Sequence, residues 1–230
     1  MLLFVCYNRF FKNPAKDTVK EKDVSVSSVS DELPDNPIDF KSLKKKNSDI
    51  YAWIKVPNTK VDYPVLQSYD DDDNFYLTHD ENKKYSFGGA IYTQRLNSLD
   101  FNDRNTVIYG HDLVSGAMFS SLHKFRNKSF FNKNKYFYIY TEKHILKYEI
   151  ISAYKYDDRH ILNSFDFSDD EVFADYLEFI KNPKTTMKNT RIDIKLNLKS
   201  RIVTLSTCIG NESDKRYLVQ GVLIEDVATK

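Results

Sequence analysis

Three side chains capable of chemistry lie at the ends of apolar segments of the sequence. Cys208 ends the segment Arg201-Ile-Val-Thr-Leu-Ser-Thr-Cys208, and Arg216 begins another apolar run eight residues later. His111 ends a second such segment, Asn105-Thr-Val-Ile-Tyr-Gly-His111. Both segments are rich in β-branched residues, which predicts strands. A thiol at a strand end is held on rigid backbone and is open to solvent, which suits a nucleophile, and its chemistry needs a base or a cation nearby.

Each of these residues also has an ordinary structural interpretation. A lone cysteine is more often a small buried hydrophobe than a reactive thiol, and Arg216 beside Lys215 fits a solvated surface cation. His111 is favoured as reactive because its strand breaks at Gly110, directly before it. The remaining histidines stand in polar loops, on a short helix expected at 118–125 or within a strand, so we expect them to be structural. They are His79, His123, His144 and His160.

The composition argues against several classes of function. The 230 residues contain 34 basic and 33 acidic side chains, so the net charge of +1 lacks the clustered positive excess that binding of nucleic acid requires. The two cysteines, Cys6 and Cys208, lie in different settings, which makes a structural disulfide improbable, and no paired-cysteine spacing suggests zinc. None of the chemistry expected here needs a cofactor.

The first 37 residues are predicted to lie outside the folded domain. Met1–Tyr7 is apolar and is followed by Arg9 and Lys12, but a helix that crosses a membrane needs about 20 residues. This segment is either the end of a signal anchor whose beginning is missing or a short helix without a special role. Residues 13–37 have the composition of a flexible linker, and the domain is expected to span 38–230.

The segments that follow predict a mainly β domain. Tyr and Phe, sixteen each, favour strands. A short helix or a helix pair is expected at 38–53. Short strands with few helices are typical of an antiparallel barrel or sandwich. Strands are expected at 53–66 (two, around a turn), 88–92, 105–110, 136–140, 145–154, 192–198, 201–207 and 217–224.

One long helix is expected at about 168–182, between the late strands. It begins at a capping box, Ser168-Asp-Asp-Glu171, and Asn182-Pro183 ends it. Its apolar residues recur at helical spacing, which predicts a stripe packed against the sheet and implies no cofactor. The residues of the stripe are Phe173, Tyr176, Leu177 and Ile180.

Four consecutive aspartates, Asp70–Asp73, form the one weak candidate for a metal site. A calcium loop alternates its ligands around a central glycine, and that pattern is missing here. We therefore prefer a solvated acidic loop and expect no bound metal.

The order, separation and strand context of the three reactive residues resemble those of the sortases, the cysteine transpeptidases of Gram-positive cell surfaces, and class B in particular. The resemblance spans roughly Asp39 to Ile224. Its supporting stretches are Trp53-Ile through Val61-Asp-Tyr-Pro-Val65, Asn74-Phe-Tyr-Leu77, Asn105 to His111 with Met118-Phe119, the helix at 168–182, and Arg201 to Cys208.

This resemblance implies a fold and a reaction. The fold is a closed eight-stranded β-barrel with N-terminal helices and one additional long helix. The enzyme cleaves a C-terminal sorting signal of the Leu-Pro-x-Thr-Gly or Asn-Pro-x-Thr-Asn kind after its threonine and joins the new carboxyl end to an amine of peptidoglycan or its precursor. By position, Cys208 is the nucleophile, His111 the general acid and base, and Arg216 the cation at the scissile carbonyl. The resemblance also implies an enzyme on the extracellular face of the membrane, held by an N-terminal anchor.

The resemblance further implies a set of substrate contacts, Asn74, Leu77, Ser206 and Thr207, although a shift of one residue would exchange Asn74 for Asp73. The chain departs from the class B pattern at Ile209, where members can carry an acid, and in the short loop between Cys208 and Arg216. Two alternatives stay open at this point. One is a thiol peptidase that hydrolyses such signals, and the other is a noncatalytic β-barrel that binds the cell wall.

Overall fold

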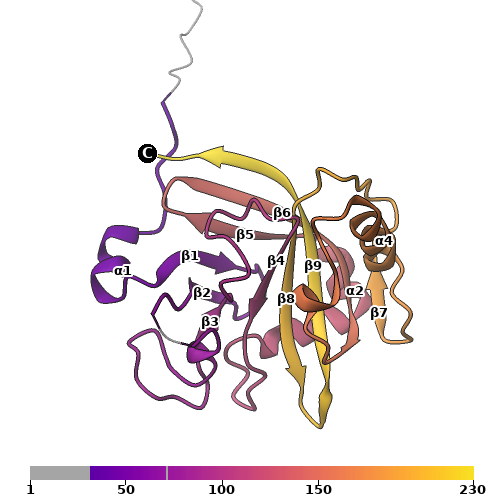
Figure 1. Cartoon of the computed structure of the whole chain (residues 1–230), viewed down its shortest axis with the longest axis horizontal. Coiled ribbons are helices and arrows are strands. Elements are labelled where there is room, and N and C mark those ends of the chain that lie inside the picture. Colours follow the sequence, from indigo (N-terminus) through magenta and orange to yellow (C-terminus); the bar gives the residue numbers. More distant parts are fainter. Residues whose placement is uncertain (1–31, 71) are drawn as a thin grey trace, which may run out of the picture. The chain divides into compact units, whose positions relative to one another are not determined.

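A closed ring of strands forms the centre of the computed structural model, which describes residues 32–70 and 72–230 (Figure 1). Within these residues, nine strands form one sheet in the order β5-β1-β2-β3-β4-β8-β9-β6-β7, and β5 also pairs with β6. This pairing closes eight strands into a barrel and leaves β7 outside it, on β6. The predicted closed eight-stranded barrel is confirmed. The strands are β1 (Ile50–Lys55), β2 (Asp62–Leu66), β3 (Ile91–Tyr92), β4 (Asn105–Tyr109), β5 (Tyr136–Thr141), β6 (His144–Asp157), β7 (Lys188–Thr190), β8 (Ile202–Ile209) and β9 (Glu212–Ala228).

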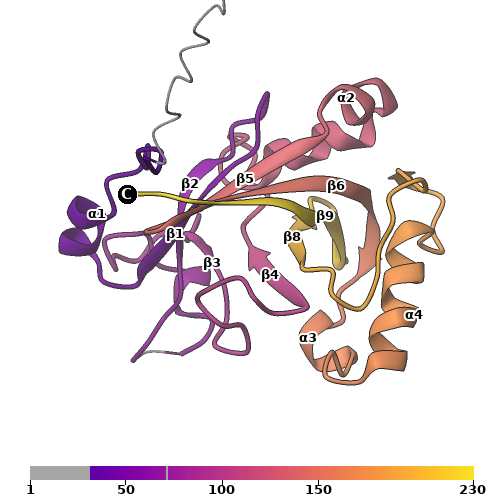
Figure 2. The same ribbon diagram turned by 90° about the horizontal axis from the view of Figure 1, so that it is seen from above.

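Short helices surround this barrel. Figure 2 shows α3 and α4 together on one side of the barrel and α1 on the opposite side. Two further segments, Phe75–Leu77 and Ser120–Arg126, are 3₁₀ helices, and the second lies where a short helix was expected at 118–125. The α-helices in the described residues are α1 (Phe40–Lys46), α2 (Lys128–Lys133), α3 (Ile161–Ser164) and α4 (Asp170–Lys181).

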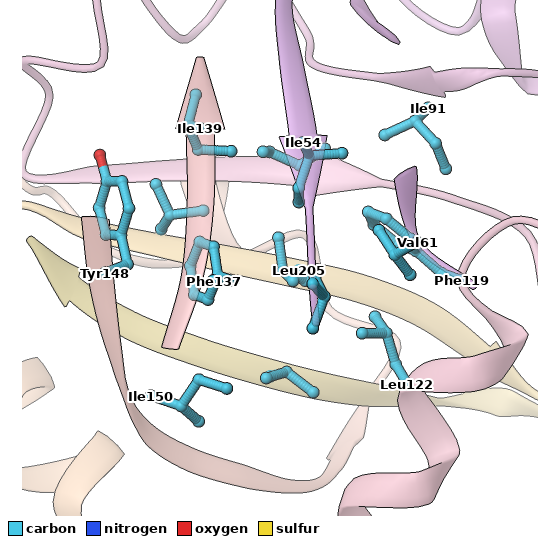
Figure 3. Close-up of a cluster of buried hydrophobic side chains, with 14 of the residues drawn as sticks. Ile54, Val61, Ile91, Phe119, Leu122, Phe137, Ile139, Tyr148, Ile150 and Leu205 are labelled. Atoms are coloured by element: carbon cyan, nitrogen blue, oxygen red, sulfur yellow. The ribbon is translucent and has the colours of Figure 1, made fainter. Parts of the chain in front are cut away.

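The barrel interior is filled by aliphatic and aromatic side chains from facing strands. Ile54 of β1, Phe137 of β5 and Leu205 of β8 are fully buried and lie in one cluster (Figure 3). Because side chains alternate between the two faces of a strand, every second residue enters this core and its neighbours face outward. The outward residues of β4, β8 and β9 are therefore free to line a site or to meet a helix.

Helix α4 covers part of the outer face of the barrel, as the apolar stripe predicted. Its four stripe residues are buried in a second core with outward residues such as Val107 and Leu218. The predicted capping box is wrong in one detail, because Asp169 is the N-cap and accepts from the main-chain N–H groups of Glu171 and Val172. The Ser168 hydroxyl instead donates to Asp166.

A buried polar network lies between α4 and the barrel strands. The Tyr176 hydroxyl of α4 accepts from Gln220 Nε2 of β9 at 2.7 Å and from Asn105 Nδ2 of β4 at 3.1 Å. Gln220 also donates to Thr204 Oγ1 of β8 at 2.8 Å and accepts from the Tyr154 hydroxyl of β6 at 2.8 Å. Buried polar groups need such partners, so the network holds β4, β8 and β9 in one fixed arrangement.

Two expected elements differ from the structure. The helix or helix pair expected at 38–53 is only α1, because Asn47 ends it and its side chain accepts from the Asp49 N–H in a tight turn, after which β1 begins. The strand expected at 192–198 is wrong. That segment is irregular and turns at Asn197, whose main-chain N–H donates to Ser200 Oγ. The strand β7, which precedes this segment in the chain, already pairs with the edge of β6.

Residues 1–37 are the predicted anchor and linker, and the first 31 of them lie outside the described residues. Of the remainder, Asn36 Nδ2 donates to the Thr141 carbonyl at 2.7 Å, and the Lys230 N–H donates to the Pro34 carbonyl at 3.1 Å. In residues 32–70 and 72–230, no helix has the length and apolar character needed to cross a membrane.

Candidate active site

The pairing of β4 with β8 brings His111 beside Cys208. These strands are parallel neighbours, with Tyr109 opposite Ser206, and the Gly110 N–H donates to the Ser206 carbonyl at 3.1 Å. His111 follows Tyr109 by two residues and Cys208 follows Ser206 by two, so both side chains lie at the same level where the two strands end.

The pairing of β8 with β9 places Arg216 on the other side of Cys208. The two residues are direct partners in the antiparallel register, so their side chains lie on one face of the sheet. The segment from 209 to 215, expected to be a loop, is instead a hairpin that continues both strands, with Ile209 opposite Glu212 and a register shift between Cys208 and Ile209. β4, β8 and β9 lie side by side (Figure 1); His111 follows the end of β4, Cys208 lies on β8 and Arg216 lies on β9.

The site lies on the outer face of the barrel, beyond the end of the buried polar network. Thr204 belongs to that network, and alternation places Ser206 and Cys208 on the same face. Ser206 is buried, whereas Cys208 is exposed and is a free thiol. The nucleophile candidate therefore stands at the open end of a rigid strand, as its sequence position predicts.

A cavity of about 230 Å³ gathers these side chains. All seven residues singled out in the sequence line it, whereas Asp73, the alternative to Asn74, pairs with Arg95 at 2.6 Å and does not. A larger open groove of about 990 Å³, lined in part by Arg191 and Lys199, contains no thiol or imidazole. The seven residues are Asn74, Leu77, His111, Ser206, Thr207, Cys208 and Arg216.

His111 is held from two sides. Its Nε2 lies 2.8 Å from the Leu77 carbonyl oxygen, and because a carbonyl only accepts, Nε2 carries the proton in this bond. The exposed Phe87 ring stacks on the imidazole at 6.1 Å between centroids. Nδ1 is therefore the ring nitrogen left to exchange a proton.

Gly110 allows β4 to end so close to its neighbours. A Cβ atom at this position would lie 2.5 Å from Ile91 Cδ1 and 2.7 Å from Phe119 Cγ. Real Cβ atoms do not approach so closely, so only glycine fits before His111.

Arg216 is oriented by main-chain oxygens. Its Nη1 donates to the carbonyls of Ser213 at 2.8 Å and Lys215 at 3.0 Å. In the part of the chain that the structure describes, no carboxylate forms an ion pair with the Arg216 guanidinium. Its charge and its remaining N–H groups are thus available to the cavity.

Comparison with known proteins assigns the chain to a family. The sortase domain model matches residues 54–224. Sortase B of Listeria monocytogenes is 32% identical over 221 residues, covering 95% of this chain and 85% of the relative. The chain belongs to the class B sortases. It is accordingly a cysteine transpeptidase of cell-wall sorting signals, and its family is associated with the surface of Gram-positive cells.

Solved structures agree with this assignment. Clostridium perfringens sortase B is 37% identical, with a TM-score of 0.72, and the match covers 81% of this chain and 100% of that chain. A Staphylococcus aureus sortase B–substrate complex is 31% identical, with a TM-score of 0.71, and the match covers 81% and 84%. The resemblance drawn from the sequence is confirmed.

The cavity of this sortase also contains a polar chain that sequence reasoning missed. His160 Nε2 donates to Gln94 Oε1 at 2.6 Å, and Gln94 Nε2 donates to Asn74 Oδ1 at 2.9 Å. Asn74 lines the cavity, and its Nδ2 has no hydrogen-bond partner among the residues that the structure describes. His160 was expected to be structural, and no local pattern in the sequence predicts its contact with Gln94.

Two tyrosines also line the cavity, Tyr92, which is buried, and Tyr109, which is partly buried. Burial raises the pKa of Tyr92 and of Tyr109 far above the ordinary value of 10.0, so both hydroxyls are neutral at physiological pH. The Tyr109 hydroxyl has no hydrogen-bond partner within the described residues.

The acidic run beside the cavity has local partners. Asp72 Oδ1 accepts from the Asn74 N–H at 2.8 Å, and Asp73 forms the ion pair with Arg95. Asp71 lies outside the described residues. Within the rest of the described chain, no group of three His, Cys, Asp or Glu side chains is placed to hold a metal ion.

Proposed function

We propose that Cys208 is the nucleophile of this sortase, His111 its general acid and base, and Arg216 the cation that stabilises the oxyanion. One observation supports the proposal: β4, β8 and β9 are neighbours in the sheet, and His111 after β4, Cys208 on β8 and Arg216 on β9 line one cavity. A nucleophile, a proton carrier and a fixed cation are the groups that acyl transfer needs.

The proposed reaction has two balanced steps. The Cys208 thiolate attacks the threonine carbonyl carbon of the signal, the amide C–N bond breaks, and the departing amine takes a proton from His111. The product is a thioester. An incoming amine then gives a proton to His111 and attacks the thioester, the C–S bond breaks, and the thiolate returns. Arg216 donates to the oxyanion in both steps.

The proposed substrate is a signal of the Leu-Pro-x-Thr-Gly or Asn-Pro-x-Thr-Asn kind. The S. aureus relative has been solved as a complex with its substrate, which supports a peptide in the corresponding cavity here. We assign Asn74 Nδ2 and the Ser206 hydroxyl to its polar groups and Leu77, 41% exposed, to its apolar side chains. Alternation turns the Thr207 side chain inward, so Thr207 contributes its main chain.

The acceptor is proposed to be an amine of peptidoglycan or its precursor, and the enzyme is proposed to act at the outer face of the membrane through an N-terminal anchor. Membership of the sortase family supports both assignments. In the absence of an amine, water is expected to take the acyl group, so that the enzyme then acts as a thiol hydrolase.

The test uses quenched peptides that carry the candidate signals, with and without added triglycine. The wild-type enzyme is expected to release the leaving fragment and, with triglycine, to form a new amide at the threonine. Cys208→Ala and His111→Ala are expected to do neither. Release of the free acid alone, even with excess amine, would identify a peptidase, and cleavage that survives Cys208→Ala would contradict the mechanism.

A further inference from the structure

A histidine–carboxylate pair, Asp112 with His123, lies next to the proposed catalytic residues. Asp112 directly follows His111, and its Oδ2 lies 2.9 Å from His123 Nε2 in the 3₁₀ helix Ser120–Arg126. The same oxygen accepts from the Gly210 N–H at 3.1 Å. One carboxylate thus connects the segment after His111 with the hairpin after Cys208.

The His123 ring is packed against β9, the second strand of this hairpin. It contacts the ring of Tyr217, the neighbour of Arg216, at 5.0 Å between centroids, and it faces the main chain of Cys208. The side chains of Asp112 and His123 are only 16% and 19% exposed. The pair is therefore a partly buried joint, by which we mean the contact of Asp112 and His123 that connects the segment after His111, the 3₁₀ helix Ser120–Arg126 and the hairpin after Cys208. Packing as well as hydrogen bonds fixes its geometry.

The segment between these residues is closed on itself, which makes the joint stiff. The Phe119 N–H donates to the His111 carbonyl at 3.0 Å, and Asp112 forms a bridge with Met118. His111 and Asp112 therefore belong to one closed segment, and the Asp112 bond to Gly210 adds a second connection between that segment and the strand that carries Cys208.

We infer that Asp112 and His123 are positioning residues of this sortase: His123 holds the Asp112 carboxylate, and Asp112 sets the separation between His111 and Cys208 through the Gly210 amide. The inference rests on the proposed roles of His111 and Cys208. Neither Asp112 nor His123 lines the cavity, so they act on the rate of acyl transfer and leave peptide binding unchanged.

The test compares variants that keep the shape of the joint. His123→Phe keeps a ring against Tyr217 and removes the N–H donor, whereas His123→Gln keeps a donor near the position of Nε2. Displacing reacting groups by about 1 Å costs about 100-fold in rate. We expect His123→Phe and Asp112→Ala to lower kcat by about 10- to 100-fold with KM within about threefold, and His123→Gln to recover most of the loss.

The double variant shows whether the two residues act as one unit. Asp112→Ala combined with His123→Phe is expected to lose no more than Asp112→Ala alone. The matched control is His144→Phe, which breaks another His–Asp pair, with Asp226 at 2.7 Å. Neither of these residues lines the cavity, so this variant is expected to leave kcat unchanged. All variants are measured below their unfolding temperatures.

Hydrogen exchange of the Gly210 amide gives a readout that needs no substrate. Asp112→Ala is expected to speed this exchange at least about tenfold, because the N–H loses its acceptor. If the wild-type enzyme turned over no signal peptide, the proposed function would fail while this readout still tested the joint. A kcat of His123→Phe within threefold of wild type, or an unchanged Gly210 exchange rate in Asp112→Ala, would overturn the inference.

Discussion

Cys208 and Arg216 stand directly opposite each other in the antiparallel pairing of β8 with β9. Their separation is therefore set by main-chain pairing, and the guanidinium is further oriented by the carbonyls of Ser213 and Lys215. In the proposed mechanism, a cation held in this way is already in place when negative charge develops on the scissile carbonyl, which is the condition for effective electrostatic catalysis.

Removing this cation tests its proposed role. Arg216→Ala is expected to lower kcat/KM for a signal peptide by about 100- to 1,000-fold, the usual cost of one oxyanion donor. Arg216→Lys is expected to recover only part of the loss, because an ammonium lacks the planar fork of donors. Lys215→Ala is the control and is expected to behave as wild type. Steady-state kinetics in which Lys restored full activity would contradict the role of the fork.

Gly110→Ala tests the close approach at the end of β4. The added methyl would meet Ile91 and Phe119 within 2.5 and 2.7 Å, so the variant is expected to lose about 1–3 kcal/mol of unfolding free energy. A Cβ atom added at Gly210 would lie 4.0 Å from its nearest neighbour, Asp112 Oδ2, so Gly210→Ala is expected to retain wild-type stability. Urea unfolding of both variants checks this. Equal stability of the two variants would show that the contact at Gly110 relaxes without cost.

The buried network under the site predicts a large effect of one hydroxyl. Tyr176→Phe leaves Gln220 Nε2 and Asn105 Nδ2 without the acceptor they share, which is expected to cost about 1–3 kcal/mol of unfolding free energy. Tyr85→Phe removes the hydroxyl of a residue that is 77% exposed and serves as the control. Urea midpoints that shift equally in both variants would contradict the importance of the network.

The lowered pKa of His123 predicts that the protein loses stability in mild acid. Burial, followed by the nearby Arg126, lowers the pKa of His123 below its ordinary value of 6.5, against the smaller effect of Asp112. Below pH 6.5 the unfolded chain therefore binds a proton that the folded chain does not, so this contribution to stability is full above pH 6.5 and is lost as pH falls through the folded pKa.

The measurement is the unfolding free energy in urea at pH 7, 6 and 5. It is expected to fall with pH in the wild-type enzyme, and His123→Gln is expected to flatten this fall. Carboxylates whose pKa is lowered, such as Asp157, titrate below this window. The same slope in both proteins would assign the effect to other groups.

Much of the site could be predicted from the sequence because its residues lie at strand ends that are visible in local composition. Cys208 and His111 each follow a run of β-branched residues, and those runs are β8 and β4. Their parallel pairing could not be derived from either run, since it joins strands far apart in the chain. The resemblance to sortases implied that His111 and Cys208 act together, and the register of β4 with β8 brings the two residues side by side.

Other features depend on contacts that no local pattern records. Residues 192–198 alternate like a strand, but the edge of β6 is already paired with β7. Ser168 fits a capping box, yet its hydroxyl is bound to Asp166 and Asp169 takes its place. His160 reaches Gln94 only because α3 and the segment after β3 meet at the cavity. Tertiary contacts decide the first and third cases, whereas a local contact between Ser168 and Asp166 decides the second.

The most direct test of the central claim is to look for the acyl intermediate on Cys208. The enzyme is mixed with a signal peptide without an amine, quenched in acid and examined by intact-mass and peptide-mapping mass spectrometry. The proposed mechanism predicts an added mass equal to the peptide up to its threonine, located on Cys208, lost on treatment with hydroxylamine and absent from Cys208→Ala. Turnover of the peptide with no adduct on Cys208, or an adduct located on another residue, would contradict it.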